Sequence, residues 1–362
     1  MTHPSVFAHI VTFNNAATIG RCLDGLFAQS GFTPGENLTV LITDNASTDG
    51  TVDRIRAQSN LRLTLDTLSE NTGFCAGHNR GVARFLESEM KYLLILNPDL
   101  RLEASALAEL VGALEGDANA GIACPKLLRA DERLDPVQPR RLDGAGMHLT
   151  TALRHFDRGS DELDTGQYDR PAYVFGGSGA CLLLRRDAVK ALLVDSAPAD
   201  ETLHGIYPFL RAPGRAPLFD EAFFAYREDA DLAWRGQTLG IQCRYVPLAA
   251  GYHKRVVTPD RRGTLPALLN RLSVRNRFLL QANNFVPTAS LAASLNGAVV
   301  RNLLVLLALP LRERASIPGV IEALRLFGRA LYRRRIIFER AREPAKRVAR
   351  WFTVSEEPCL FS

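Results

Sequence analysis

Three carboxylates stand close together in the stretch FFAYREDADLAWR, residues 223–235. Glu228, Asp229 and Asp231 directly follow an aromatic, apolar run. Acids in the first turn of a helix complement the helix dipole, which is the simpler explanation of the cluster. Crowding also raises the proton affinity of at least one acid, and such a carboxylate is suited to take a proton from a hydroxyl group. The cluster is therefore a candidate for a general base.

Polar side chains follow several apolar segments in the first part of the chain. Residues 7–13, 38–45 and 92–99 are rich in apolar and β-branched residues and alternate with helical patterns, which predicts a mainly parallel sheet. Parallel sheets bind ligands beyond the carboxyl ends of their strands. Asn and Asp are also common in turns, but three successive strands that end in them favour a ligand site. These residues are Thr12, Asn14, Asp44, Asn45, Asn97 and Asp99.

Charge divides the 362 residues unevenly. Residues 1–253 carry 24 Lys+Arg and 32 Asp+Glu, whereas residues 254–362 carry 20 and 7. A basic segment of this kind indicates an anionic partner, either a membrane surface or a nucleic acid. We predict two regions, an α/β domain over residues 1–260 and a helical, basic, amphipathic region over residues 261–362.

The basic region also contains a strongly apolar run, SLAASLNGAVVRNLLVLLALPL. Asn296, Arg301 and Asn302 interrupt it, so we do not expect it to cross a bilayer. A helix lying at the membrane surface is expected instead, with arginines that reach anionic head groups. The alternative is a buried helical hairpin with a solvated basic face. Few aromatic residues are interleaved with the basic ones, which argues against nucleic-acid binding.

Three further segments have the composition of loops. Residues 130–175 show little periodicity and predict a mobile loop or a hairpin near the site. Residues 195–217 contain four prolines and are expected to form an insertion or lid. Gly176, Gly177, Ser178 and Gly179 are expected to form either a loop that lets a ligand come close or a simple turn before a strand.

Several motifs occur in an order that resembles the inverting family-2 glycosyltransferases of the GT-A fold, especially rhamnosyltransferase-like members. They are IVTFNNAATIGRCLDGL, ITDNASTDGT, NTGFCAGHNRGV, LLILNPD, GGSGACLLLRR, FDEAFFAYREDADLAWR and YHKR. The resemblance covers about the first 260 residues. It implies a Rossmann-like, mainly parallel sheet with helices on both faces, followed by a membrane-associating helical segment.

The resemblance also implies roles for individual residues. Asp229 is the expected general base, Glu228 and Asp231 tune or orient it, and Arg235 pairs with an acid or with phosphate. Asp99 of the Asn97-Pro98-Asp99 sequence, where the family carries two acids, and His253 are the expected ligands of Mg²⁺ or Mn²⁺. The residues expected to bind the donor nucleotide are Thr12, Asn14, Asp44, Asn45, Asn71, Gly73, Phe74 and Asn79.

The function implied is transfer of a sugar, with L-rhamnose from dTDP-L-rhamnose as the leading expectation, to a glycan or lipid-linked acceptor. The expected pathway is the biosynthesis of a cell-surface polysaccharide, such as lipopolysaccharide or a cell-wall glycan. The N-terminal residues lack a secretory leader, so we expect a cytoplasmic protein peripheral to the inner face of the membrane. Whether the protein forms a homodimer is left open.

Two alternatives come from other classes of protein. A sugar-phosphate nucleotidyltransferase would share the α/β domain, but a glycine-rich loop with a basic residue is expected after its first strand, and VTFNNAATIG has none. A non-catalytic membrane or nucleic-acid adaptor would use the basic region and would have no need of Asp229 or Asp99.

Overall fold

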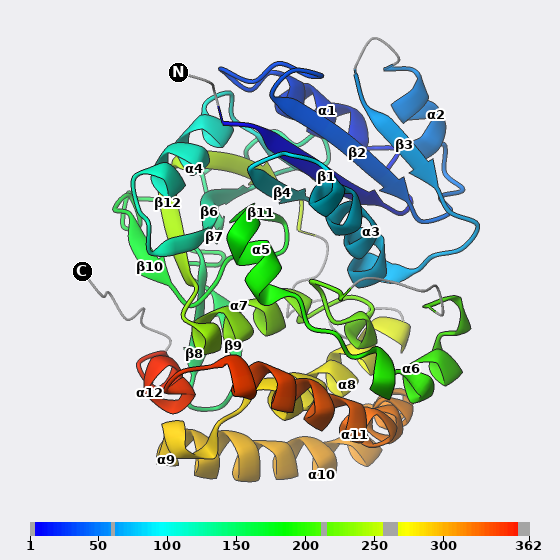
Figure 1. Ribbon diagram of the computed structural model, residues 1–362, viewed down its shortest axis with the longest axis vertical. Coiled ribbons are helices and arrows are strands. Elements are labelled where there is room, and N and C mark those ends of the chain that lie inside the picture. The colour runs from blue at the N-terminus through cyan, green and yellow to red at the C-terminus, as the bar shows by residue number, and fades with distance from the viewer. Residues whose placement is uncertain (1–3, 59–61, 211–215, 256–266, 354–362) are drawn as a thin grey trace.

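A ten-stranded mixed sheet forms the centre of the protein in the computed structural model, which describes residues 4–58, 62–210, 216–255 and 267–353 (Figure 1). Its order is β10-β12-β6-β11-β4-β1-β2-β3, with β5 paired to β12 and β7 paired to β6. The α/β fold predicted from the sequence is confirmed. The strands of this sheet are β1 (Val6–Thr12), β2 (Leu38–Asp44), β3 (Thr64–Thr67), β4 (Tyr92–Leu96), β5 (Leu100–Leu102), β6 (Ala120–Arg129), β7 (Leu142–Gly144), β10 (Ala172–Val174), β11 (Cys181–Arg185) and β12 (Gln242–His253).

The four strands β1 to β4 are parallel and carry the predicted ligand edge. Thr12 is in register with Asp44, so the last residues of β1 and β2 lie side by side. Alternate residues of β1 face opposite sides of the sheet. Ile10 and its neighbours pack with α1, whereas Phe7 packs with α3, so helices cover both faces. The helices of this part are α1 (Ile19–Phe27), α2 (Thr51–Arg56), α3 (Gly73–Glu87), α4 (Ala106–Glu115) and α5 (Arg186–Leu192).

The second half of the sheet brings distant residues to the same edge. The end of β12 pairs with β5, which places His253 opposite Leu100 and therefore beside Asp99. Residues 130–175 contain β7 and β10 of the main sheet, together with a hairpin of β8 (Met147–Thr150) and β9 (His155–Asp157). The hairpin alternative for this segment is therefore confirmed. The insertion expected at residues 195–217 contains η1 (Ala197–Ala199), α6 (Glu201–Ile206) and η2 (Pro208–Leu210), and residues 211–215 lie outside the described part.

The C-terminal helices form a layer against α7 (Glu228–Leu239), on the side of the molecule away from β1 to β3 (Figure 1). Buried ion pairs join this layer to the segment before α7. Oδ1 of Asp220 lies 2.6 Å from Nη1 of Arg329, and its Oδ2 lies 3.0 Å from Nε of Arg333. The boundary drawn at residue 260 stays a prediction. The elements are α8 (Ala267–Asn284), η5 (Pro287–Ala289), α9 (Leu291–Ala293), the π-helix η6 (Ser294–Arg301), α10 (Asn302–Arg312), η7 (Arg314–Ser316), α11 (Ile317–Arg340), α12 (Pro344–Ala349) and β13 (Phe352–Thr353).

The apolar run forms one continuous helical stretch, Leu291–Leu311, at the outer border of this layer (Figure 1). It has 21 residues, and an 18-residue window within it has a mean hydropathy of 1.7, with 11% of that window buried. It is therefore long and apolar enough to cross a membrane by length and composition alone. The expectation that this stretch lies at a membrane surface and does not cross the bilayer stays a prediction.

Candidate functional site

The glycine-rich loop at residues 176–180 connects two parts of the predicted site. The Gly179 N–H donates a hydrogen bond to Oδ2 of Asp229, at 3.1 Å. One residue later, the carbonyl of Ala180 accepts a hydrogen bond from the Asn97 N–H, at 2.9 Å. Asp229 and the Asn97-Pro98-Asp99 turn therefore lie on either side of one short loop, which supports the interpretation of residues 176–179 as part of the site.

The segment that leads into α7 has a strained backbone. Phe224, Tyr226 and Arg227 have φ angles of 62°, 70° and 72°, a region that non-glycine residues rarely adopt. The side chain of Asn276 on α8 holds this segment, because its Nδ2 donates to the carbonyls of Phe223, Ala225 and Tyr226 at 2.8–2.9 Å. Such strain persists only when the surrounding structure imposes it, and it is common at active sites.

The three acids of α7 have different surroundings. Asp229 accepts hydrogen bonds from Gly179 and Ala230, and burial raises its pKa. Glu228 is buried, and burial together with the charge of Asp229 raises its pKa well above the ordinary value. Asp231 is 1% exposed, accepts hydrogen bonds from Asn283 and Asn284 at 3.2 and 2.7 Å, and lies in the interior. The structure thus brings Asp229 and Glu228 to the site and turns Asp231 toward α8.

Asp99 and His253 face each other at the predicted metal position. Asp99 Oδ1 is 3.4 Å from His253 Nε2, and no hydrogen bond from the described residues reaches this buried oxygen. The other ring nitrogen of His253 lies 2.8 Å from Oδ2 of Asp143. A metal-binding histidine commonly bonds a carboxylate in this way, which fixes the orientation of its ring. The pair therefore fits two ligands of a divalent cation.

Charge around His253 supports this interpretation. Burial lowers the pKa of His253, but Asp143 and Asp99 raise it more, to about 10. Burial raises the pKa of Asp143, but His253, Arg255 and Arg129 together lower it to about 2. A cation bound at Nε2 would displace the proton there. Among the described residues no group of three or more His, Cys, Asp or Glu side chains could hold a metal, so the protein offers two ligands at this position.

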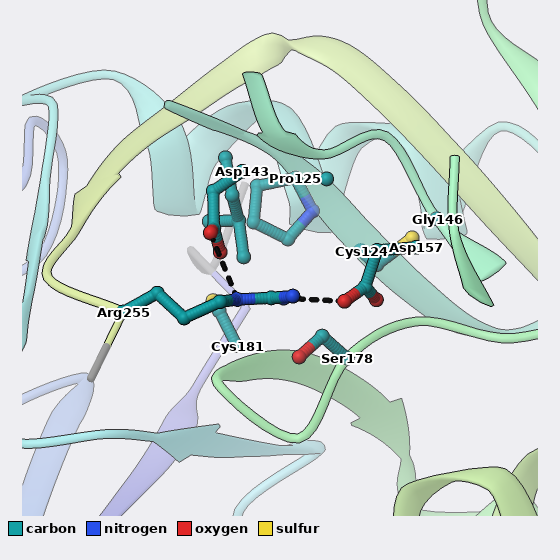
Figure 2. Close-up of a pocket in the computed structure, with 10 residues that line it drawn as sticks. Cys124, Pro125, Asp143, Gly146, Asp157, Ser178, Cys181 and Arg255 are labelled. Atoms are coloured by element: carbon teal, nitrogen blue, oxygen red, sulfur yellow. Dashed lines mark hydrogen bonds and ion pairs between the residues drawn. The ribbon is translucent and has the colours of Figure 1, made fainter. Parts of the chain in front are cut away.

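A small pocket lies beside these residues, and Figure 2 shows Arg255 extended between Asp143 and Asp157. Nε of Arg255 is 2.9 Å from Asp143 Oδ1, and its Nη2 pairs with Asp157. Ser178 of the glycine-rich loop lines the same pocket. Sequence reasoning assigned no role to Arg255, Asp157 or Asp143. Arg255 belongs to the YHKR motif, so the sequence offered a signal for it as a site residue. Asp143 and Asp157 lie in a segment without a recognisable pattern.

The expected nucleotide-binding residues of β1 and β2 do cluster. Thr12 Oγ1 donates to Asp44 Oδ1 at 2.8 Å, and the Ser47 hydroxyl donates to the same oxygen at 2.6 Å. Asn14, with φ of 58°, accepts from the N–H of Thr48 at 2.9 Å. These hydrogen bonds hold the loops that follow β1 and β2 against each other at the carboxyl end of the sheet.

Asn45 and the NTGF motif form a second group. Asn45 accepts from the Thr72 hydroxyl at 2.9 Å and donates to the Gly73 carbonyl at 3.1 Å, while Asn71 accepts from the Gly73 N–H at 2.9 Å. Gly73 has φ of +80°, and a Cβ there would lie 2.6 Å from the carbonyl oxygen of Phe224. Glycine is therefore required where α3 meets the strained segment.

Two of the expected donor-binding residues, Asn79 and Phe74, also make contacts within the protein. Asn79 accepts from the N–H groups of Leu218 and Phe219 and donates to the side chain of Glu221. Phe74 packs against the rings of His78 and Phe219.

Arg235 is fully buried and bonds the carbonyls of Leu192 and Leu218 as well as Asp231. The expected contact of Arg235 with phosphate is replaced by these interior contacts, while its pairing with an acid of the cluster is present.

The parallel strands, the site at their carboxyl ends and the mixed second half together define the GT-A fold. The sequence model of glycosyl transferase family 2 matches residues 8–193. The chain belongs to glycosyl transferase family 2. This excludes the sugar-phosphate nucleotidyltransferase as the class of protein. The search of curated proteins gave no match to this chain.

Solved structures with the same fold are distant in sequence. GalNAc-T7 with UDP, GalNAc and Mn²⁺ has a TM-score of 0.53 and 12% identity over 77% of this chain and 48% of that one. Residues 1–349 of S. aureus TarS with UDP-GlcNAc have a TM-score of 0.51 and 13% identity over 92% and 90% of the two chains. The longer TarS chain has a TM-score of 0.50, with 14% identity over 92% and 55%. The chain spans about half of GalNAc-T7 and of this longer TarS chain.

Proposed function

We propose that the protein transfers a sugar from a nucleoside-diphosphate sugar to a hydroxyl group of an acceptor, with inversion at the anomeric carbon. The observation that carries this proposal is the glycine-rich loop at residues 176–180, which contacts Asp229 on one side and the Asn97 turn beside Asp99 on the other. A base and a cation-binding carboxylate at one site are the two groups that direct displacement of a diphosphate requires.

Asp229 takes the proton of the acceptor hydroxyl as that oxygen attacks the sugar. Its raised pKa, caused by burial, makes it a stronger base than an exposed aspartate. Hydrogen bonds from Gly179 and Ala230 fix the carboxylate, which limits the geometries from which attack can begin. A bound divalent cation, held by Asp99 and His253, would offset the negative charge of the departing diphosphate.

The donor and the acceptor are proposed on the resemblance of the sequence motifs to rhamnosyltransferase-like enzymes. We propose dTDP-L-rhamnose as the donor and a glycan or lipid-linked intermediate of a cell-surface polysaccharide as the acceptor. The structure of TarS with UDP-GlcNAc supports the general class of nucleotide-sugar donors, because the two proteins share a fold.

A membrane-bound acceptor agrees with the surface of the C-terminal layer. We define the apolar surface as the exposed side chains of α9 to α11. They are Leu291, Leu295, Val299, Val300, Leu303, Leu304, Leu306, Leu307, Leu311, Ile317, Ile321, Leu324, Phe327 and Leu331. An apolar surface with nearby arginines suits the head-group region of an anionic bilayer. We propose that the enzyme docks there, on the cytoplasmic face of the membrane.

The test is to incubate the purified protein with a panel of nucleotide sugars, with Mg²⁺, Mn²⁺ or EDTA, and to measure release of the nucleoside diphosphate. We expect release with one donor, dependence on the cation, and a loss of about 10²-fold or more in Asp229→Asn. Asp135→Asn, which changes an exposed acid of a surface ion pair, is the matched control and should behave like the parent. No release with any donor, or full activity of Asp229→Asn, would refute the proposal.

A further inference from the structure

A continuous series of contacts joins the predicted cation position to the β8–β9 hairpin. Nε2 of His253 lies 3.4 Å from Oδ1 of Asp99, and its Nδ1 lies 2.8 Å from Oδ2 of Asp143. Oδ1 of Asp143 lies 2.9 Å from Nε of Arg255, and Nη2 of Arg255 pairs with Asp157 on β9. Figure 2 shows the guanidinium group between the two carboxylates. Arg255 therefore connects the residues that face the cation position with the hairpin.

The pocket around Arg255 also adjoins the proposed base. Ser178 lines this pocket, and the N–H of the next residue, Gly179, donates to Asp229 at 3.1 Å. The hairpin is joined to the same loop, because the Met147 N–H donates to the carbonyl of Gly176 at 2.7 Å. The pocket therefore has the cation position on one side and the base on the other.

Electrostatic effects on the base agree with this position. Burial raises the pKa of Asp229 most, and the hydrogen bond from Gly179 lowers it. The charge of Asp157 raises this pKa further, whereas the charge of Arg255 lowers it. Such effects weaken with distance, so both side chains lie near the base.

The geometry of the proposed reaction determines what occupies this place. In a direct displacement the anomeric carbon is bonded to the departing diphosphate on one side and meets the acceptor oxygen on the other. The diphosphate belongs at the cation position beside Asp99 and His253, and the acceptor hydroxyl belongs at Asp229. The sugar that is transferred must therefore lie between them, against the pocket that Asp157 and Arg255 line.

The charges of the pocket limit which sugars fit. Among the described residues that line it, Arg255 is the one basic side chain, and both Asp143 and Asp157 already pair with it. Arg129 stands behind the pocket and is engaged by Asp143 at 3.2 Å. A sugar with its own carboxylate would have to break one of these ion pairs or face two acids, and both are costly. Hydroxyl groups can donate to the same carboxylates and leave the pairs intact.

We propose that Asp157 and Arg255 determine the specificity for the transferred sugar, because as an ion pair they admit an uncharged sugar and reject a uronic acid. This inference rests on the proposed function, since the base and the cation position locate the sugar. It does not depend on the choice of rhamnose, which comes from the sequence motifs alone.

The test compares two nucleotide sugars that differ in one group. At C6, glucose carries a hydroxymethyl group and glucuronic acid carries a carboxylate. Calorimetry with Mn²⁺ first establishes whether UDP or dTDP binds the full-length protein more tightly, and the glucose and glucuronate forms of that nucleotide are then titrated. We expect the glucose form to bind at least about tenfold more tightly, because the carboxylate meets like charges.

Two variants should change this preference in opposite directions. Asp157→Asn leaves Arg255 able to pair with the carboxylate of the sugar, so the preference for the glucose form should fall by about tenfold or more. Arg255→Gln removes the positive charge and should increase the preference. Each ratio is taken within one variant, so a general loss of nucleotide affinity cancels.

Surface variants serve as matched controls, and the outcomes separate the two proposals. Asp135→Asn and Arg84→Gln, which change exposed ion pairs, should keep the ratio of the parent. Equal affinity of the parent for the two forms, or shifts of the same sign in Asp157→Asn and Arg255→Gln, would overturn the proposed selection while nucleotide binding stands. If neither nucleotide binds with Mn²⁺, the proposed function fails and this inference fails with it.

Discussion

Glu228, Asp229 and Asp231 show how neighbours divide similar side chains into different roles. Asn283 and Asn284 from α8 bind the carboxylate of Asp231, and Arg235 pairs with it inside the protein. Asp229 instead bonds the glycine-rich loop. A role for Asp231 in proton transfer stays a prediction, and its contacts fit a residue that joins α7 to α8.

The rate of the reaction should depend on pH through Asp229. Its pKa is raised, so the fraction of ionised base falls at a higher pH than for an exposed aspartate with a pKa of about 3.9. The profile of kcat/KM against pH should therefore fall on the acidic side with a midpoint above that value. A midpoint at or below it would contradict the assignment of the base.

Substitution of Glu228 separates the two neighbouring acids. Burial and the charge of Asp229 raise the pKa of Glu228 well above its ordinary value, which favours its protonated form. Glu228→Gln resembles the protonated form and should keep activity within about tenfold of the parent. The kcat of Glu228→Gln is compared with that of Asp229→Asn, and the variant with the larger loss identifies the base. A larger loss in Glu228→Gln would make Glu228 the base.

For single residues, the sequence predicts which side chains are suited to a reaction better than it predicts where those side chains point. Asp229, Asp99 and His253 were recognisable because they follow apolar segments in an order typical of the family. Arg235 and Asn79 belong to the same motifs, yet their side chains bond backbone carbonyls and N–H groups of residues 192 and 218–219. Which way such a side chain points depends on contacts distant in the sequence, and no local pattern records them.

At the scale of elements, α8 shapes the segment before α7. Nδ2 of Asn276 contacts three carbonyls of that segment, and Nη2 of Arg275 contacts those of Ala222 and Phe223 at 2.6 and 3.0 Å. The helix therefore supplies the hydrogen bonds that keep Phe224, Tyr226 and Arg227 in unfavourable conformations. Each such conformation costs about 1–3 kcal/mol.

Removal of the Asn276 amide should release this strain and misplace the base. We expect Asn276→Ala to lower kcat by about 10²-fold while the affinity for the donor nucleotide changes less, because Thr12 and Asp44, two residues that we propose bind the nucleotide, lie on β1 and β2. Steady-state kinetics and nucleotide titration measure the two quantities. Asn119→Ala, at an exposed turn, is the control, and an equal loss of nucleotide affinity in Asn276→Ala would indicate a general structural defect instead.

The strands were predictable and the contacts of α8 were not. β1, β2 and β4 are apolar runs bounded by polar residues, so periodicity and composition locate them. α8 has a polar sequence, ALLNRLSVRNRFLLQANN, in which Asn276 and Arg275 read as solvent-facing residues. They are buried because the carbonyl groups that they bind come from a strained segment about fifty residues earlier, which the sequence of α8 does not reveal.

For the whole molecule, the proposed docking of the apolar surface on a membrane can be tested by substitution. Exchange of Leu303 and Leu307, which are 54% and 60% exposed, for aspartate should weaken sedimentation with phosphatidylglycerol vesicles by about tenfold or more. Leu248→Asp, at a residue that is 70% exposed on β12, is the control. Sedimentation that is equal for all three proteins would remove the membrane proposal. A concentration-dependent dimer that the aspartates dissociate would assign the surface to a second copy.

The last described strand has a practical consequence for anyone who shortens this protein. β13 pairs with β8, so Phe352 and Thr353 form an outer strand of the hairpin whose other arm carries His155 and Asp157. A stop codon ahead of Phe352 would expose the backbone of β8 as an unpaired edge, which invites association between molecules. Affinity tags are therefore better placed ahead of β1 than after β13, and precipitation of a chain that ends before Phe352 is first to be traced to this lost strand.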